Sequence, residues 1–223
     1  MAVTIHTRPV SDLTSAEVEA WRSVPVSIAV DLARNGGQID PVIRPLKPPG
    51  HQATLFGRAV TALCEPPDFG AVVHALGVVG SGDVLVIAAA GNSDFAMIGE
   101  ILAGHLRNRG CAGLVCDGAV RDVATLASWS NFSVFTRHIT PRGPASAERG
   151  AVNLPVVIGG QLVSPGDLIL GDSDGLIALV PAAVLSGIKA ARDKIAREAE
   201  WIDSLARGKS PADTFGLGKA ETI

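Results

Sequence analysis

The sequence predicts an α/β protein: a layered αββα sandwich in a single domain, ending in a C-terminal helix. In the middle of the chain, short all-apolar stretches typical of buried strands alternate with segments of helical periodicity. The later part is rich in short strands separated by Gly and Pro, and a long helical segment follows it. Helices on both sides of a strand-rich centre favour stacked layers over a plain doubly wound sheet. The 223 residues, 47% of them hydrophobic, suffice for one core over about 26–180 and a helix over about 181–206.

The first third of the chain predicts two short helices and then strands. Residues 14–17 have the pattern of a capping box, and residues 26–34 are amphipathic before a stop at Gly36-Gly37. A proline-rich connection over 41–49 follows. Strands are then expected at 55–64 and 84–90, linked by a helical stretch at 69–76.

The middle of the chain predicts two further strand–helix units. Ser93-Asp94 is expected to cap a helix that ends at Gly110. Its apolar residues at helical spacing are Ile98, Ile101, Leu102 and Leu106. A strand over 111–116 follows, then a turn at Asp117-Gly118, a helix over 122–127 and a strand over 132–135.

The last third predicts strands at 154–158, 161–163, 167–170 and 176–180. Pro181 then begins a long helix that runs through Leu205, since proline is favoured at the first helical position.

Composition excludes two classes of function. The net charge is −3 and no basic stripe is present, so nucleic-acid binding is not expected. The longest aliphatic stretch, 84–90, is too short to cross a bilayer, so we expect a soluble, cytoplasmic protein with no membrane partner. The cysteines Cys64, Cys111 and Cys116 are odd in number and lie in apolar stretches, which indicates structural roles in a reducing compartment.

Two other patterns indicate structure more than chemistry. The glycines of 77–82 are spaced GxxGxG and precede a strand, whereas a dinucleotide fingerprint follows one, so they predict a turn. The five histidines are scattered without the spacing of a metal site.

Three charged residues form the candidate site. Glu100 is expected near the start of one helix, and Arg121-Asp122 lie where a strand ends and the next helix begins. Open α/β sheets place ligands at such strand ends. Two acids and an arginine there can hold a hard cation and an anionic substrate together. The alternative is that Asp122 only caps its helix and Arg121 makes a surface ion pair.

Glu100 is followed by twenty residues and then by Arg121-Asp122. This order resembles the signature of the class II pyruvate aldolases for 4-hydroxy-4-methyl-2-oxoglutarate and 4-carboxy-4-hydroxy-2-oxoadipate. That family shares its fold with the regulators of RNase E activity. Further stretches resemble family blocks in the same order, so the resemblance covers about 26–217. These stretches are 40–46, 57–61, 82–86, 110–122, 139–144 and 165–175.

The resemblance implies a role for each candidate residue. Asp122 would bind Mg²⁺ or Mn²⁺, and Glu100 would orient the waters around the metal. Glu198 from the C-terminal helix of a neighbouring subunit would assist it, with Glu200 as the alternative. Arg121 would hold the pyruvyl oxygens. The N–H groups of Ile101 and Leu102, following Gly99, would receive the substrate carboxylate.

The implied function is a divalent-metal-dependent lyase that cleaves a 4-hydroxy-2-oxo acid to pyruvate and decarboxylates oxaloacetate through the same enolate. Its partners would be the small 2-oxo acid and further copies of the chain in a trimer or hexamer. No lysine occupies a comparable position, which argues against a Schiff-base aldolase. The chain departs from the family in having Thr125 shortly after Arg-Asp, where an acid is usual, and Ile98 before Gly-Glu, where an aromatic is common.

The competing function is a non-catalytic regulator that binds a protein partner, as the regulators of RNase E activity do. Metal-dependent release of pyruvate by the purified protein distinguishes the two classes.

Overall fold

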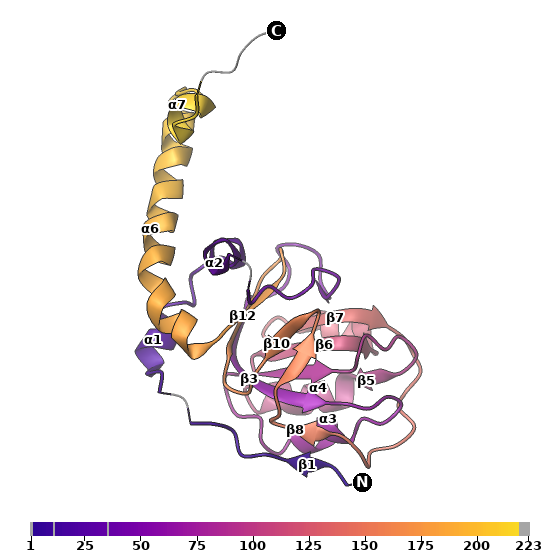
Figure 1. Ribbon diagram of the computed structural model, residues 1–223. Helices are drawn as coiled ribbons and strands as arrows, with labels where there is room; N and C mark the ends of the chain where they lie inside the picture. Colours follow the sequence, from indigo (N-terminus) through magenta and orange to yellow (C-terminus); the bar gives the residue numbers. More distant parts are fainter. Residues whose placement is uncertain (1, 11, 35, 219–223) are drawn as a thin grey trace.

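The computed structural model describes residues 2–10, 12–34 and 36–218, which form one ten-stranded sheet and a separate hairpin (Figure 1). Along its main path the sheet has the order β1-β8-β3-β4-β6-β7-β2. The ladders β3–β4, β4–β6 and β6–β7 are parallel. The strands are β1 (Thr4–Ile5), β2 (Arg44–Pro45), β3 (Leu55–Leu63), β4 (Asp83–Ala88), β6 (Gly113–Val120), β7 (Ser133–Ile139) and β8 (Ala151–Val152).

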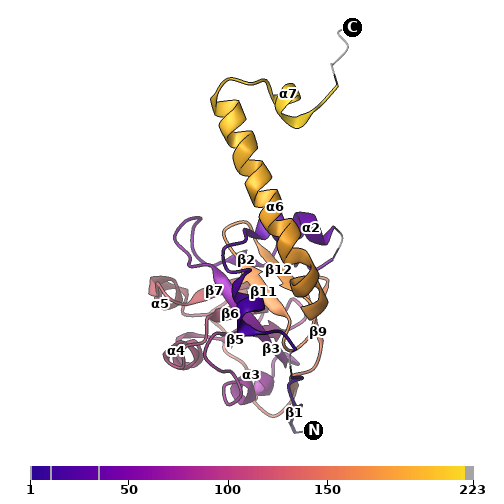
Figure 2. The same cartoon turned by 90° about the vertical axis from the view of Figure 1, so that its left-hand side faces the viewer.

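Three helices cover one face of this sheet. They are α3 (Gly70–Ala75), α4 (Glu100–Asn108) and α5 (Val123–Ser128), and they lie together on one side of the strands in Figure 2. Alternate residues of the parallel strands, among them Leu85, Ile87 and Leu114, pack against this helical layer in one core cluster. The period of two along each strand produces this division of side chains between faces.

The other face is covered by more strands and then by helices. The strands are β9 (Val156–Ile158), β10 (Gln161–Val163), β11 (Leu168–Gly171) and β12 (Leu176–Leu179), and β11 also pairs with β3. Ile169 and Ala178 pack toward the main sheet, whereas Leu168 and Ile177 pack toward the terminal helices. The protein is therefore a mixed α/β sandwich in four layers, as the sequence predicted.

The outer layer consists of helices from both ends of the chain. They are α1 (Ser15–Glu19), α2 (Val26–Ala33) and α6 (Pro181–Ala206). The first part of α6 packs on α2 through Val184 and Ala191, and the rest extends away from the body (Figure 1). α7 (Pro211–Phe215) folds back so that Phe215 meets Trp201, with ring centroids 5.2 Å apart. In the part of the chain that the structure describes, no helix is long and apolar enough to cross a membrane.

Several local predictions are confirmed. Thr14 and Glu17 form the capping box, each accepting a hydrogen bond from the other's backbone N–H. The helix that begins at Pro181 ends within one residue of the predicted Leu205. The glycines of 77–82 lie in the turn between α3 and β4.

Two predictions around the candidate site are wrong. Ser93-Asp94 does not begin a helix: Ala96–Ile98 form the short strand β5, and α4 begins at Glu100. Asp117-Gly118 is not a turn, because β6 continues through both residues to Val120. The two errors share one cause. β6 runs beyond the end of β4, and its extension becomes the partner of β5, with a register irregularity near Asp117. This long-range pairing overrides the helical spacing of the apolar residues.

Candidate functional site

The two halves of the candidate site meet because β5 and β6 are parallel neighbours. Ile98 is the register partner of Val120, and the Arg121 N–H donates to the Ile98 carbonyl at 3.1 Å. The residue pairs that follow these strands, Gly99-Glu100 and Arg121-Asp122, therefore lie side by side. The structure brings together the acid, the arginine and the second acid that the sequence singled out.

Asp122 links the starts of two helices. It occupies the N-cap position of α5, but with φ of 57° and no capping hydrogen bond to its own helix. Its Oδ2 atom instead accepts the Glu100 N–H at 3.0 Å, so it caps α4. The Arg121 Nε atom lies 3.5 Å from the same oxygen. In the described ranges nothing donates a hydrogen bond to Oδ1, so one carboxylate oxygen remains available for a ligand.

The N-terminus of α4 offers donors next to this carboxylate. The first bond within the helix runs from the Ala103 N–H to the Gly99 carbonyl. The N–H groups of Ile101 and Leu102 therefore precede the regular ladder, and no described residue accepts from them. Free N–H groups at the positive end of a helix attract carboxylates and phosphates. The predicted anion site at Ile101 and Leu102 is compatible with this geometry.

A cavity of about 210 Å³ opens beside these groups. Arg121 is its charged residue and the other walls are mainly apolar. The lining residues are Phe69, Ala96, Met97, Ile98, Gly99, Ile101, Leu102, Arg121 and Pro144. Ile98, one of the departures from the resembled family, is buried and forms part of this wall, so its size bears on the shape of the pocket.

Two glycines make room for the charged side chains. A Cβ on Gly99 would lie 2.3 Å from Asp122 Oδ2 and 2.8 Å from Arg121 Cγ. A Cβ on Gly143 would lie 2.6 Å from Arg121 Nη1. Real Cβ atoms do not approach so closely. The arginine is therefore held between two positions where only glycine fits without a shift.

The donor set suits a hard, well-hydrated cation. In ranges 2–10, 12–34 and 36–218, no three His, Cys, Asp or Glu side chains gather into a closed metal site. The site instead has the free oxygen of Asp122 and the exposed carboxylate of Glu100. Mg²⁺ is typically bound by one or two carboxylates and keeps several waters, so these residues fit Mg²⁺ or the similar Mn²⁺.

The remaining predicted residues are not part of this cluster within one chain. Glu198 lies on α6, which belongs to a different layer of the fold from α4 (Figure 2), and its Oε1 is 3.3 Å from Lys194 Nζ. Glu200 is exposed on the same helix. Thr125 is half-buried on α5, and its carbonyl accepts the Ser128 hydroxyl. A role for Glu198 or Glu200 in this site therefore stays a prediction, and it requires a second subunit.

The loop that contains Gly143 and Pro144 and lies beside the cavity was not predicted as part of the site. Pro144 lines the cavity, Gly143 contacts Arg121, and Phe69 from the turn before α3 faces the same space. A signal was present, since 139–144 was one of the stretches that resembled the family. Its Gly-Pro pair is typical of a loop and does not reveal which residue the loop contacts.

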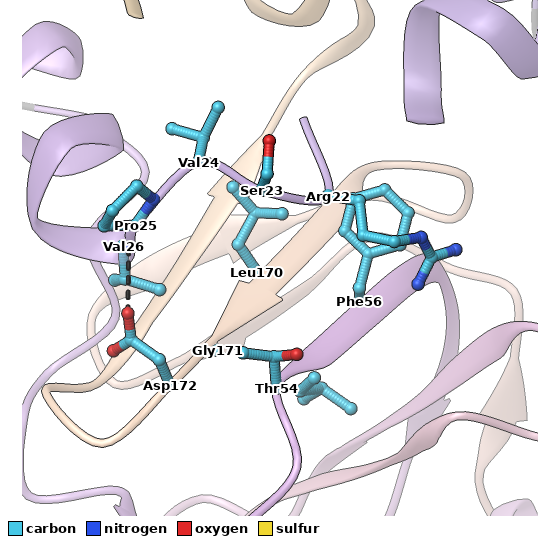
Figure 3. Close-up of a pocket in the computed structure, with 11 residues that line it drawn as sticks. Arg22, Ser23, Val24, Pro25, Val26, Thr54, Phe56, Leu170, Gly171 and Asp172 are labelled. Atoms are coloured by element: carbon cyan, nitrogen blue, oxygen red, sulfur yellow. Dashed lines mark hydrogen bonds between the residues drawn. The ribbon is translucent and has the colours of Figure 1, made fainter. Parts of the chain in front are cut away.

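A larger cavity, of about 280 Å³, lies elsewhere and is structural in character (Figure 3). Its acid, Asp172, accepts the Val26 N–H at 3.0 Å and the Asp174 N–H at 2.9 Å, which ties α2 to the turn after β11. Its cation, Arg22, lies 4.3 Å from the centre of the Phe56 ring. Both charged groups therefore already have partners within the protein.

The three cysteines are poor nucleophiles. Burial raises the pKa of the Cys64 thiol to about 12 and that of Cys111 to about 11. Burial also raises the pKa of Cys116 well above its usual range. Such thiols stay protonated at neutral pH, which supports the structural role inferred from the sequence.

Comparison with known proteins agrees with the geometry. Residues 8–178 match the model of the RraA-like family, described as Aldolase/RraA. A protein of Halalkalibacterium halodurans named "Putative 4-hydroxy-4-methyl-2-oxoglutarate aldolase" is 31% identical over 170 residues, which is 75% of this chain and 79% of the relative.

Solved structures show the same fold. The RNA-processing inhibitor RraA of Thermus thermophilus is 30% identical with a TM-score of 0.63, over 70% of this chain and 93% of that one. An uncharacterized protein of Pseudomonas syringae superposes with a TM-score of 0.80 over 92% of this chain and 99% of that one. Its identity is 23%, so this likeness concerns the fold alone.

Proposed function

This chain belongs to the RraA-like family, and on that premise we propose that it is a divalent-metal-dependent lyase that cleaves a 4-hydroxy-2-oxo acid to pyruvate. The observation that carries the proposal is the meeting of Glu100, Arg121 and Asp122 at two adjacent strand ends, beside free helix N–H groups. Relatives named as aldolases support the cleavage of a carbon–carbon bond.

The pyruvyl end of the substrate would bind where positive charge converges. Its carboxylate would accept hydrogen bonds from the N–H groups of Ile101 and Leu102, which follow Gly99. The Arg121 guanidinium would donate to the oxygen of the 2-oxo group. That oxygen gains charge as the enolate forms, so the contact strengthens in the transition state and accelerates the reaction.

The proton transfers would depend on two carboxylates. Loss of the proton from the 4-hydroxyl group makes that carbon a carbonyl, and the bond between C3 and C4 breaks. Its electron pair moves into the pyruvate enolate, which is then protonated at C3. We propose that Glu100 of one subunit and Glu198 of a neighbour, with Glu200 as the alternative, orient the water that makes these transfers.

Asp122 would hold the cation, Mg²⁺ or Mn²⁺, which when bound supplies a Lewis acid next to the 2-oxo acid. Asp122 also holds the backbone at Glu100, since it accepts that residue's N–H. Oxaloacetate decarboxylation would use the same residues, because loss of CO₂ from its C4 leaves the same enolate.

The proposal extends to the assembly and the setting. We propose a homo-oligomer, a trimer or hexamer, in which α6 lies at the interface and carries Glu198 to the neighbour's site. We also propose that the enzyme works in the cytoplasm, where the buried thiols of Cys64, Cys111 and Cys116 stay reduced.

The second candidate is a protein-binding regulator without catalysis. The observation that favours it is the 30% identity to the RNA-processing inhibitor RraA. A regulator of this kind has no need for a free carboxylate oxygen at Asp122 beside an arginine in an apolar cavity, so we rank the lyase first.

The test is a screen of the purified protein with 4-hydroxy-2-oxo acids and oxaloacetate, with Mg²⁺ or Mn²⁺ and coupled detection of pyruvate. We expect release of pyruvate that stops on chelation and returns with either metal. A matched control is 2-oxoglutarate, which lacks the 4-hydroxyl group and should not be cleaved. Full activity after removal of the metal, or no activity with any substrate, would overturn the proposal.

A further inference from the structure

A buried carboxylate, that of Asp68, directly precedes Phe69, which lines the cavity. The Asp68 side chain is fully buried, and all of its polar contacts are donors. Its Oδ1 atom accepts the N–H groups of Gly70 at 2.8 Å and Arg149 at 3.0 Å. Its Oδ2 atom accepts the Glu148 N–H at 2.9 Å and the Ser146 hydroxyl. Four hydrogen bonds thus converge on one anion.

These donors keep Asp68 ionised inside the fold. Burial opposes the charged form, but the hydrogen bonds from Ser146 and from the N–H groups of Glu148, Gly70 and Arg149 outweigh it and lower the pKa well below its usual range. A charged group that is closed off from solvent is stable only while this set of donors is in place.

Most of the donors belong to one segment, residues 142–149, which we call the strap. The strap is also bonded to the body at other points. The Ala96 N–H of β5 donates to the Arg142 carbonyl at 2.8 Å, and the Ala145 N–H donates to the Pro67 carbonyl at 2.9 Å. The Phe69 N–H donates to the Ser146 carbonyl at 3.0 Å. Asp68 therefore anchors the far end of a loop whose near end is joined to β5.

The strap contacts the candidate catalytic arginine. Gly143 packs against Arg121 Nη1 so closely that a Cβ would lie 2.6 Å from that atom. Pro144 of the strap and Phe69, the neighbour of Asp68, both line the same cavity as Arg121. From this chain of contacts we infer that Asp68 is a positioning residue, which sets the place of the Arg121 guanidinium through the strap. This inference rests on the proposed role of Arg121 in binding the 2-oxo acid.

An uncharged replacement cannot reproduce this anchor. In Asp68→Asn the amide oxygen can take the place of Oδ1 and still accept two N–H groups. The amide NH₂ group then takes the place of Oδ2, where it faces two other donors, the Ser146 hydroxyl and the Glu148 N–H. The Ser146 hydroxyl can turn to accept a hydrogen bond, whereas the Glu148 N–H cannot. The strap must therefore shift at Glu148, and the Gly143 contact should loosen.

The experiment is a double-mutant cycle on kcat/KM for oxaloacetate with saturating Mg²⁺. We expect Asp68→Asn to lower kcat/KM by about 10- to 100-fold in the native background, as misplaced groups do. In the Arg121→Ala background the same change should cost less than about threefold, because residues that act through one another are not additive. Equal losses in both backgrounds would show a general structural effect and overturn the inference.

Asp167→Asn is the matched control. Asp167 is also a buried acid, but its carboxylate accepts the Ser164 N–H and does not line the cavity. Its replacement should leave kcat/KM within about twofold of the parent in both backgrounds. A loss equal to that of Asp68→Asn would mean that any buried acid gives the effect, which contradicts a specific link to Arg121.

Two further measurements cover other outcomes. If Asp68→Asn does not fold, Ser146→Ala removes one donor and keeps the carboxylate, and its loss of kcat/KM should likewise vanish without Arg121. If the native protein releases no pyruvate, the proposed function fails, and a crystal structure of Asp68→Asn then decides the inference. Displacement of the Arg121 guanidinium from Gly143 supports it, and an unchanged position overturns it.

Discussion

Arg121 and Asp122 are adjacent, but replacing each of them should have a different effect on metal binding and activity. Asp122→Ala removes the candidate metal ligand, so the affinity for Mn²⁺, measured by calorimetry, should fall by more than about tenfold and turnover should collapse. Arg121→Ala leaves the carboxylate and should keep Mn²⁺ binding. It removes a charge-assisted contact worth roughly 2–4 kcal/mol in the transition state, or about 30- to 1,000-fold in kcat/KM.

A lysine control separates shape from charge at this position. Arg121→Lys should not restore full activity, because an ammonium lacks the planar fork of the guanidinium. If both residues only stabilise the helix starts, each alanine variant would lose about 1 kcal/mol of stability and keep its activity with saturating Mg²⁺. That result would favour the regulator.

Gly99 should be as sensitive as the charged residues, although it carries no side chain. Its φ of −143° is open to any residue, so the obstacle is space: an added Cβ would lie 2.3 Å from Asp122 Oδ2. Gly99→Ala should displace both charged side chains and lower kcat/KM by about 100-fold or more while the protein stays folded. Circular dichroism with steady-state kinetics checks both parts.

Gly104→Ala on the same helix is the control for Gly99. A Cβ at Gly104 would lie 3.6 Å from the Trp129 ring, which is an ordinary contact. Alanine is favoured over glycine in a helix interior by roughly 0.5–1 kcal/mol, so this variant should be active and slightly more stable. An active Gly99→Ala enzyme would contradict the crowding argument.

At the scale of elements, the sequence predicted well what local pattern encodes. The capping box at Thr14, the helix from Pro181 and all-apolar strands such as β4 follow from cap residues and local composition alone. The strand Ala96–Ile98 does not follow in this way, because among the strands that the structure describes it pairs with the extension of β6, about twenty residues later. Its apolar residues also match the spacing of the helix that follows.

In the candidate site, too, some features follow from local sequence and others depend on long-range contacts. Glu100, Arg121 and Asp122 could be chosen from residue type, position at strand ends and resemblance, and the structure brings them together. The contact of Gly143 with Arg121 could not, since it depends on how a loop is held by a buried acid some eighty residues earlier. Long-range anchors of this kind have no local signature.

The link between the strap and α3 should depend on pH. Because the pKa of Asp68 is lowered in the folded state, its contribution to stability is fully present above the unfolded value, about 4, and is lost as the pH falls below it. Asp68→Asn should therefore lower the free energy of unfolding at pH 7 by roughly 1–3 kcal/mol. The difference from the native protein should shrink at about pH 2.5. Urea unfolding at the two pH values measures this.

Ionisation of Asp167 should affect the stability of the fold in the opposite direction. Burial raises its pKa in the folded state, so its ionisation opposes folding as the pH rises above the unfolded value. Asp167→Asn should be neutral or stabilising at pH 7.

For Asp68→Asn, a loss in the free energy of unfolding that does not change with pH would contradict the prediction. It would show that the loss comes from packing and not from the carboxylate charge.

At the scale of the whole molecule, the distal half of α6 stands apart from the body (Figure 1). Ile202 is 69% exposed and Leu205 is 37% exposed, although both are large apolar residues. Val184 and Ala191, by contrast, are buried against the rest of the chain. Exposed apolar side chains on a helix that projects from the body are suited to contact with another subunit, and this is the helix that carries Glu198.

If sites are shared between subunits, two inactive variants should restore each other. Glu198→Ala lacks the residue contributed to the neighbour, and Asp122→Ala lacks the residue in its own body. In a cyclic oligomer assembled from an equal mixture, a complete site needs Glu198 from an Asp122→Ala chain and Asp122 from a Glu198→Ala chain. Each condition holds for half of the subunits, so about one quarter of the native activity should return after the mixture is unfolded and refolded together.

The same experiment with Glu200→Ala distinguishes the two glutamates, since the variant of the residue that is not used stays active alone. Mixed oligomers that are verified by mass spectrometry and still lack activity would show that α6 does not complete a neighbouring site.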